Sequence, residues 1–362
     1  MRPDPAASPP HHPPHALALI PHQGPPPEGL WAAPLHIAAR RLAHPEGWLY
    51  QWPGFYAEAD FQGDTAWLRL GPGRVRLRLW VDGTAWPDTV TSTPGLHRLQ
   101  GLTPGRHRLR VEVLGEYRDG PRLFGGLWLP AGAHAWAPAP RTRQMEFIGD
   151  SHTVGYGNTA DQLVCSDEEV WRHTDPTRAY GPQLAARFDA DYRLTAISGR
   201  GVVRNHDGHA APTLPEVWDQ GLADPASPRD EAGHAWRPQV LVVALGTNDF
   251  STPLRPGERW PSRAALQADY RQHYAALLAT LRARHPQALQ VVWANEHFDG
   301  EIQTQALAVV QQRRAAGDER VHFLPISGLA MSGCRWHPSS ADHREVAARL
   351  ETLLHGVDGA WG

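Results

Sequence analysis

The spacing of apolar residues changes once along this chain, at the proline-rich segment 137–140. Before it, from residue 29 to 138, apolar and polar residues alternate in short runs such as 75–81 and 108–113, separated by turns rich in Gly, Pro and Asp. This alternation, with no helical stretch between the runs, predicts an antiparallel β-sandwich of jelly-roll type. After residue 139, short apolar runs alternate with helical stretches, which predicts a parallel sheet covered by helices on both faces.

The second part of the chain carries predicted strands and helices in alternation. Strands are expected at 144–148, 192–197, 240–245, 289–293 and 321–325, and helices at 179–188, 262–285, 303–314 and 339–354. In parallel α/β sheets, sites form beyond the carboxyl ends of the strands. The chemistry is therefore expected just after residues 148, 197, 245 and 325.

The composition excludes several classes of protein. Among the 362 residues, 35 basic side chains stand against 38 acidic ones, which excludes an electrostatic nucleic-acid binder and a polybasic membrane anchor. No apolar run approaches the roughly 20 residues that cross a bilayer. All the basic residues are arginine, so Schiff-base and Ser-Lys chemistry are excluded. The 15 tryptophans, most of them expected in cores, give a weak indication of a sugar ligand.

Residues 1–28 are rich in Pro and His and contain one short apolar stretch, 16–20. Such a segment cannot bury a core, so we expect a disordered, solvated tail, followed by a sandwich domain at 29–138 and an α/β domain at 139–362. The start of the chain lacks the basic region, apolar region and cleavage site of a secretory signal. A cytoplasmic location is the default expectation, with an exported or periplasmic location as the alternative.

Three short motifs follow three of the predicted strands. In Gly-Asp-Ser at 149–151, a serine at a tight turn presents its hydroxyl at the sheet edge, where backbone N–H groups can stabilise an oxyanion. The motif Ser-Gly-Arg-Gly at 198–201 lets a backbone N–H approach a substrate oxygen, and Gly-Thr-Asn-Asp at 246–249 offers the amide of Asn248 as a donor. Each motif alone is common as a turn, but their coincidence with strand ends favours a catalytic site.

A fourth motif, Cys-Arg-Trp-His-Pro at 334–338, precedes the last predicted helix. Serine alone is a poor nucleophile and needs a base that takes its proton. Among 21 histidines, His337 is the one that lies in a strand-end loop with these companions. The order of the four motifs indicates a serine hydrolase in which Ser151 attacks and His337 is the base.

Taken together, these motifs resemble those of the SGNH hydrolases. The forms Gly-Asp-Ser-x-x-x-Gly-Tyr-Gly-Asn at 149–158, Ser-Gly-x-Gly-Val-x-Arg-Asn at 198–205 and Gly-Cys-x-Trp-His-Pro at 333–338, preceded by a jelly roll, are similar to carbohydrate esterase family 2. The resemblance covers nearly everything after the tail. It implies a flavodoxin-like three-layer α/β domain packed against the sandwich. No metal-ligand spacing is visible, so neither a cofactor nor a metal is expected.

Carried over to this chain, the resemblance implies an oxyanion hole made of the N–H groups of Ser151 and Gly199 and the side chain of Asn248. One departure concerns the acid, because hydrolases of this type commonly carry an aspartate two or three residues before the histidine, where Cys334 and Arg335 stand here. A backbone carbonyl could orient the imidazole in a Ser-His dyad, an acid could come from elsewhere, or the protein could be inactive. We favour the dyad, since some family members are understood to work as dyads and a carbonyl can do the orienting.

The resemblance also bears on the two cysteines, Cys165 and Cys334. Members of the family carry cysteines in these neighbourhoods, and a bond between them would tie the nucleophile loop to the base loop. Free thiols remain equally open, because the missing export signal favours a reducing compartment.

Four further side chains near predicted strand ends are candidates for contact with a sugar. They are Trp336, Trp293, Trp171 and Arg200. Core packing explains Trp293 at least as well, since it closes a buried strand.

The expected activity is removal of O-acetyl groups from acetylated polysaccharides or oligosaccharides, such as xylan or mannan, through an acetyl-enzyme. No nucleic acid or membrane is expected as a partner, and no oligomeric state is predicted. One alternative is a lipid or small-ester GDSL-type esterase that uses the same loops. Another is a carbohydrate-binding protein that kept the fold and lost turnover with its acid.

Overall fold

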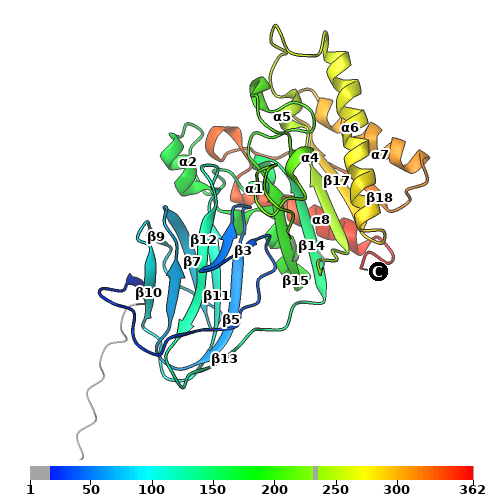
Figure 1. Ribbon diagram of the computed structural model, residues 1–362. Coiled ribbons are helices and arrows are strands. Elements are labelled where there is room, and N and C mark those ends of the chain that lie inside the picture. Colours follow the sequence, from blue (N-terminus) through cyan, green and yellow to red (C-terminus); the bar gives the residue numbers. More distant parts are fainter. Residues whose placement is uncertain (1–16, 231–234, 362) are drawn as a thin grey trace, which may run out of the picture.

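The computed structural model describes residues 17–230 and 235–361, which form an antiparallel β-sandwich followed by a parallel α/β domain (Figure 1). The last strand of the sandwich ends at Trp136, and the first strand of the parallel sheet begins at Arg143. The architecture therefore changes at the proline-rich segment, and the predicted fold class is confirmed. Our domain division after residue 138 falls within this connection.

The sandwich consists of two antiparallel sheets. The first has the order β1-β10-β6-β12-β4-β3, with β2 paired to β12, and the second has the order β13-β5-β11-β7-β8, with β9 paired to β7. The strands of the first sheet are β1 (Ala18–Pro21), β2 (Trp31–Ala32), β3 (Leu42–His44), β4 (Gly47–Tyr50), β6 (Trp67–Leu70), β10 (Gly95–Gln100) and β12 (Arg122–Leu129). Those of the second are β5 (Tyr56–Gln62), β7 (Val75–Val81), β8 (Thr84–Ala85), β9 (Thr89–Thr91), β11 (Arg106–Leu114) and β13 (His134–Trp136). Inward side chains of both sheets share one core.

Strand β1 corrects the expected extent of the tail. Residues 18–21 pair antiparallel with β10, and Leu19 lies opposite Leu99 in the core. The short apolar stretch that we assigned to a solvated tail is enough to complete a sheet edge, because backbone pairing adds to the burial of Leu19. Residues 1–16 lie outside the described residues.

The parallel sheet has the strand order β15-β14-β16-β17-β18. Its strands are β14 (Arg143–Gly149), β15 (Ala190–Ala196), β16 (Val240–Ala244), β17 (Leu289–Asn295) and β18 (Val321–Ile326). In chain order this is 2-1-3-4-5, the flavodoxin-like arrangement, in which the site lies where the order reverses. That switch point is at β14, between its neighbours β15 and β16.

Helices cover both faces of this sheet, which gives the predicted three layers (Figure 1). One face carries α3 (Tyr180–Arg187) and α8 (Ser340–His355), and the other carries α6 (Arg263–Arg284) and α7 (Glu301–Ala315). The short helices are α1 (Ser151–Val154), α2 (Asp167–His173), α4 (Leu214–Val217) and α5 (Thr247–Phe250), with 3₁₀ turns η1 (Pro176–Arg178), η2 (His206–Gly208) and η4 (Cys334–Trp336). Within the described ranges, no helix offers an apolar stretch that could span a bilayer.

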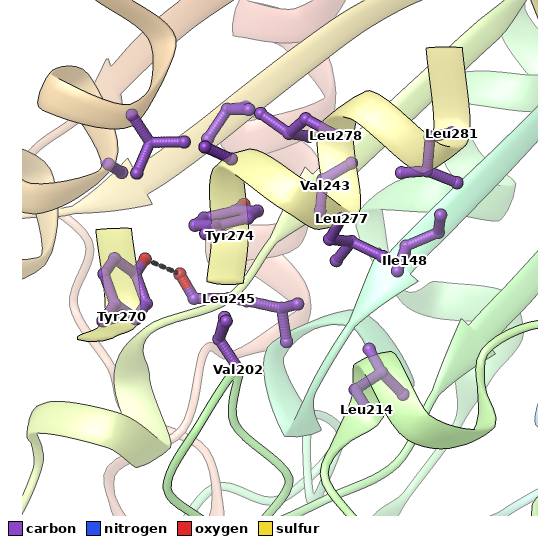
Figure 2. Packing of buried hydrophobic residues seen from close by; sticks show 14 of the residues in the cluster. Ile148, Val202, Leu214, Val243, Leu245, Tyr270, Tyr274, Leu277, Leu278 and Leu281 are labelled. Carbon is purple, nitrogen blue, oxygen red and sulfur yellow. Dashed lines mark hydrogen bonds between the residues drawn. The ribbon is translucent and has the colours of Figure 1, made fainter. Parts of the chain in front are cut away.

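The core under α6 holds the end of β16 in place (Figure 2). The hydroxyl of Tyr270 donates a hydrogen bond of 2.8 Å to the carbonyl of Leu245. A Cβ at Gly246 would lie 2.7 Å from that hydroxyl, and its φ of +128° also favours glycine. The turn that presents Asn248 is therefore anchored in the hydrophobic core.

The sandwich docks on β15, the edge strand of the parallel sheet. Asp191 of β15 accepts a hydrogen bond of 2.6 Å from the hydroxyl of Tyr56 on β5. The buried guanidinium of Arg40 donates to Glu146 of β14 at 2.7 Å. Burial alone would raise the pKa of Glu146, but Arg40 and Arg193 beside it lower that pKa to about 2. Buried polar contacts thus fix β15, which leads into Ser198 and Gly199, and its neighbour β14, which leads into Ser151.

Candidate active site

Ser151 begins helix α1, directly after β14 ends at Gly149. A Cβ at Gly149 would lie 2.1 Å from Oγ1 of Thr153, so this turn accepts glycine alone. Asp150 caps the helix, because its Oδ1 accepts a hydrogen bond of 3.0 Å from the N–H of His152. The turn places Ser151, which is 5% exposed, at the carboxyl end of the sheet as the sequence predicts.

The structure brings the predicted nucleophile and base together. Oγ of Ser151 lies 2.9 Å from Nε2 of His337, although the two residues are 186 positions apart. They meet because β14 and the loop before α8 both end at the same edge of the sheet. This distance allows direct proton transfer from the hydroxyl to the imidazole.

The other ring nitrogen of His337 is held by the main chain. Its Nδ1 lies 3.0 Å from the carbonyl oxygen of Cys334 and 3.0 Å from that of Arg335. Because carbonyl oxygens only accept hydrogen bonds, Nδ1 carries the proton and Nε2 presents a lone pair to the serine hydroxyl. Among the residues that the structure describes, no carboxylate contacts this ring. The geometry therefore matches the dyad rather than an acid supplied from elsewhere.

An unusual backbone conformation produces this arrangement. Arg335 and Trp336 have φ values of +53° and +58°, in the left-handed region that side chains other than glycine rarely adopt. Two consecutive residues of this kind turn the chain so that the carbonyls before them point back at His337. Strained backbone of this type persists where the surroundings hold it.

Burial lowers the pKa of His337 to about 4, even though its bonds to the carbonyls of Arg335 and Cys334 raise it. The imidazole is therefore neutral at neutral pH and ready to accept a proton. The ring of Tyr156 lies against it, with 4.4 Å between the ring centroids. Tyr156 and the edge of His152, 5.6 Å away, keep the imidazole in position.

The loop that carries His337 is clamped to the chain after the nucleophile. Cys165 and Cys334 form a disulfide, which is one of the two states that the sequence left open. The side chain of Arg335 donates to the carbonyl of Cys165 at 3.1 Å and to Asp167 at 2.6 Å. A Cβ at Gly157 would lie 2.3 Å from that of Cys334, so the third glycine of the motif at 149–158 allows this close approach.

The predicted oxyanion donors lie at the switch point. Ser151 stands at the N-terminus of α1, where backbone N–H groups have no partner within the helix. Gly199 has a φ of +84° and no heavy atom within 4 Å of a Cβ placed on it. The space on the Cβ side of Gly199 is therefore open to a ligand.

The side chain of Asn248 links the loops that carry these donors. Its Nδ2 donates to Oδ2 of Asp150 at 3.0 Å and to the carbonyl of Arg200 at 2.8 Å. Asp249 accepts hydrogen bonds from three successive N–H groups of the second loop, those of residues 202–204. Because both amide hydrogens of Asn248 are engaged, donation to an oxyanion requires one of these bonds to be shared or exchanged.

A residue of the sandwich also reaches this loop. Glu116, in the connection between β11 and β12, accepts a hydrogen bond of 2.8 Å from the N–H of Ser198. Burial raises the pKa of this carboxyl group. Sequence reasoning missed Glu116 and the packing of Tyr156 on His337. The Gly-Tyr-Gly motif could have drawn attention to the tyrosine, whereas no signal in the sandwich pointed to the glutamate.

The tryptophans predicted to contact a sugar differ in how exposed they are. Trp336 is 64% exposed and lies next to His337, so its ring is open to a ligand. The prediction that Trp293 contacts a sugar was wrong. Its side chain is 2% exposed, and its ring packs edge-on against that of Tyr180 inside the core. The ring of Trp171 is covered, because the guanidinium of Arg74 lies 3.8 Å from its centroid.

Two family models match this chain. That of the GDSL-like lipase/acylhydrolase family matches residues 147–355, and that of the carbohydrate esterase 2 N-terminal domain matches residues 41–140. The two matches correspond to the α/β domain and to most of the sandwich.

Relatives of the whole chain carry both parts. An acetylxylan esterase/glucomannan deacetylase of Cellvibrio japonicus is 38% identical and covers 91% of this chain and 92% of its own. A solved carbohydrate esterase, whose active site displays divergent catalytic and non-catalytic binding functions, is 36% identical with a TM-score of 0.84 over 92% of this chain and 100% of its own. A family two carbohydrate esterase from Clostridium thermocellum in complex with cellohexaose is 25% identical with a TM-score of 0.77, covering 91% and 98%. The protein therefore belongs to the GDSL-like lipase/acylhydrolase family and, within it, to carbohydrate esterase family 2.

Proposed function

We propose that the protein hydrolyses O-acetyl esters on polysaccharides such as xylan or glucomannan. The observation that carries this proposal is the 2.9 Å contact between Ser151 and His337, with the imidazole held in its reactive tautomer by two carbonyls. The 38% identical acetylxylan esterase/glucomannan deacetylase supports the choice of substrate.

In the acylation step, Oγ of Ser151 attacks the carbonyl carbon of the acetyl ester while Nε2 of His337 takes the hydroxyl proton. The negative charge that develops on the carbonyl oxygen is stabilised by the N–H groups of Ser151 and Gly199, with the amide of Asn248 as the third donor. The intermediate collapses when the C–O bond to the sugar breaks, and the imidazolium gives its proton to the departing sugar oxygen, which leaves as a hydroxyl group.

In the deacylation step, water attacks the acetyl group on Ser151. His337 takes a proton from the water, and the same donors hold the second oxyanion. Collapse of this intermediate breaks the bond to Oγ, returns the proton to Ser151 and releases acetate. The neutral imidazole, whose pKa is about 4, is in the correct state to begin each step at neutral pH.

Because no carboxylate accompanies His337, the imidazolium that forms during the reaction is less stabilised than in a triad. The acid of a triad holds the imidazole tautomer and stabilises the imidazolium that forms. The carbonyls of Cys334 and Arg335 supply the first role fully and the second in part, because a carbonyl dipole attracts a cation less strongly than a full negative charge. The geometry therefore supports turnover without a triad acid.

Acetate release from a panel of esters tests the proposal. We expect acetate from acetylated xylan and acetylated glucomannan, and none from either with the Ser151→Ala variant. Hydrolysis restricted to long-chain acyl esters would favour the small-ester alternative. Binding of the polysaccharide without acetate release would favour a carbohydrate-binding protein.

A further inference from the structure

A groove between the two domains is lined by two arginines. Arg118 belongs to the β11–β12 connection of the sandwich, and Arg200 belongs to the loop after β15. Both line two adjoining hollows of about 460 and 260 Å³, which also share Gln51, Ile197 and Ala223. The larger hollow has the size of small-molecule sites, roughly 300–1,000 Å³.

Neither guanidinium has a hydrogen-bond or ion-pair partner among the described residues. The acidic side chains around the groove each have another hydrogen-bond partner, and Glu116 acts on the arginines through its charge alone. Glu116 accepts from the N–H of Ser198, Asp119 pairs with Arg122, Glu216 accepts from the N–H of Thr213, and Asp224 accepts from the N–H of Ala226. The groove thus presents two cations whose N–H donors are available to a ligand.

The surroundings of Arg200 favour the binding of a negatively charged group, as the causes of its lowered pKa indicate. Burial lowers its pKa first, and the like charge of Arg118 lowers it further, against the raising effects of Glu116 and Glu216. A ligand carboxylate between the two arginines would relieve this repulsion.

The loop after β15 links the groove to the catalytic centre, although Ser151 and His337 line neither hollow. The carbonyl of Arg200 accepts the 2.8 Å hydrogen bond from Asn248, and the residue before it is Gly199. On the sandwich side, the charge of Arg118 opposes the burial that raises the pKa of Tyr156, and the ring of Tyr156 packs on His337. A saccharide with its ester at Ser151 can therefore place a neighbouring residue in the groove.

We propose that this groove is a subsite for a carboxylate-bearing sugar, a uronic acid residue on the acetylated chain, held by Arg118 and Arg200. A guanidinium binds a carboxylate through two parallel N–H···O bonds, and Ile197 and Ala223 give the sugar ring an apolar wall. This inference rests on the proposed function and adds to it a preference for acidic acetylated saccharides.

The test compares acetate release from two acetylated xylo-oligosaccharides that differ only in one glucuronic acid substituent. We expect the wild type to have a higher kcat/KM on the acidic substrate, and this preference should shrink as salt is added. Arg118→Gln and Arg200→Gln should each reduce the acidic-to-neutral ratio of kcat/KM on the order of tenfold. Arg98→Gln is the matched control, because Arg98 is an exposed sandwich arginine outside the groove, and its ratio should equal that of the wild type.

A binding measurement separates this subsite from turnover. Calorimetry on the Ser151→Ala protein, which keeps both arginines, should show tighter binding of the acidic oligosaccharide, and Arg118→Gln in that background should remove the difference. Equal binding and equal kcat/KM for the two substrates would overturn the subsite while the proposed function stands. Absence of acetate from both substrates, with selective binding of the acidic one, would overturn the proposed function and keep the subsite.

Discussion

The carbonyl oxygen of Cys334 lies 3.0 Å from Nδ1 of His337, so the residue that orients this imidazole is also one half of the disulfide. Its partner, Cys165, follows the nucleophile by a short loop. The covalent bond thereby joins the two sides of the dyad. Cys334 therefore both cross-links the two loops and orients the proposed base.

We expect the Cys165→Ser/Cys334→Ser double variant to lose both stability and rate. The bond closes a loop across 169 positions, and its removal should lower the free energy of unfolding by about 3–5 kcal/mol. The value of kcat should fall about tenfold, because the carbonyl of residue 334 then holds His337 less firmly. Urea unfolding and acetate release measure the two effects. An unchanged kcat in a folded double variant would show that Arg335 and Gly157 hold the loop without the disulfide.

The pKa of His337 gives a second prediction. Because burial lowers this pKa to about 4, the ring should titrate by NMR with a midpoint near that pH, well below the ordinary value. Esterase activity should be lost as the pH falls through the same range, since a protonated imidazole cannot accept the proton of Ser151. The unfolded chain binds this proton at higher pH than the folded one, so His337 also makes stability fall as the pH drops from about 6.5 towards 4.

Circular dichroism at each pH would verify that the protein is still folded during the titration. A midpoint at or above about 6.5 for the His337 ring would contradict the buried, neutral base.

Glu116 gives a third prediction, on how the sandwich contributes to catalysis. Glu116→Ala leaves the N–H of Ser198 without its acceptor, so the adjacent Gly199 should be less well placed and kcat should fall about tenfold with little change in KM. Glu116→Gln keeps an acceptor oxygen and should restore most of the rate. Steady-state kinetics on a small acetyl ester distinguish the two. Identical losses in the Ala and Gln variants would point to the charge rather than to the hydrogen bond.

A fourth prediction concerns Asn248. If its amide joins the oxyanion hole, Asn248→Ala should lower kcat on the order of a hundredfold or more, with a smaller effect on KM. The same side chain braces Asp150 and Arg200, so thermal unfolding of the variant must accompany the kinetics. A near-native kcat would remove Asn248 from the list of oxyanion donors and leave it a bracing role.

Much of this site could be predicted because its residues stand where strands end. Apolar runs place β14, β15 and β16 within a few residues, and the loops after them must meet at one edge of a parallel sheet. The contact between Ser151 and His337 follows from that topology. Because no aspartate precedes His337 at the usual positions, the sequence favoured a backbone carbonyl as the group that orients the imidazole. In the structure two carbonyls, those of Cys334 and Arg335, contact Nδ1 of His337.

The other features of the site could not be predicted, because they depend on three-dimensional geometry that no local sequence pattern indicates. The left-handed conformations of Arg335 and Trp336 occur at residues that ordinarily avoid them, so no pattern marks them. The contact of Glu116 with Ser198 depends on how two domains dock. Trp293 was misplaced because helices cover both faces of the sheet, so every residue of β17, including Trp293, is buried.

Labelling with a fluorophosphonate, read by intact mass and peptide mapping, tests the Ser-His dyad most directly. We predict one adduct per chain, on Ser151, with labelling slowed by several orders of magnitude in His337→Ala because the hydroxyl then lacks its base. An unlabelled wild-type protein, an adduct on another residue, or equal labelling rates with and without His337 would contradict the account.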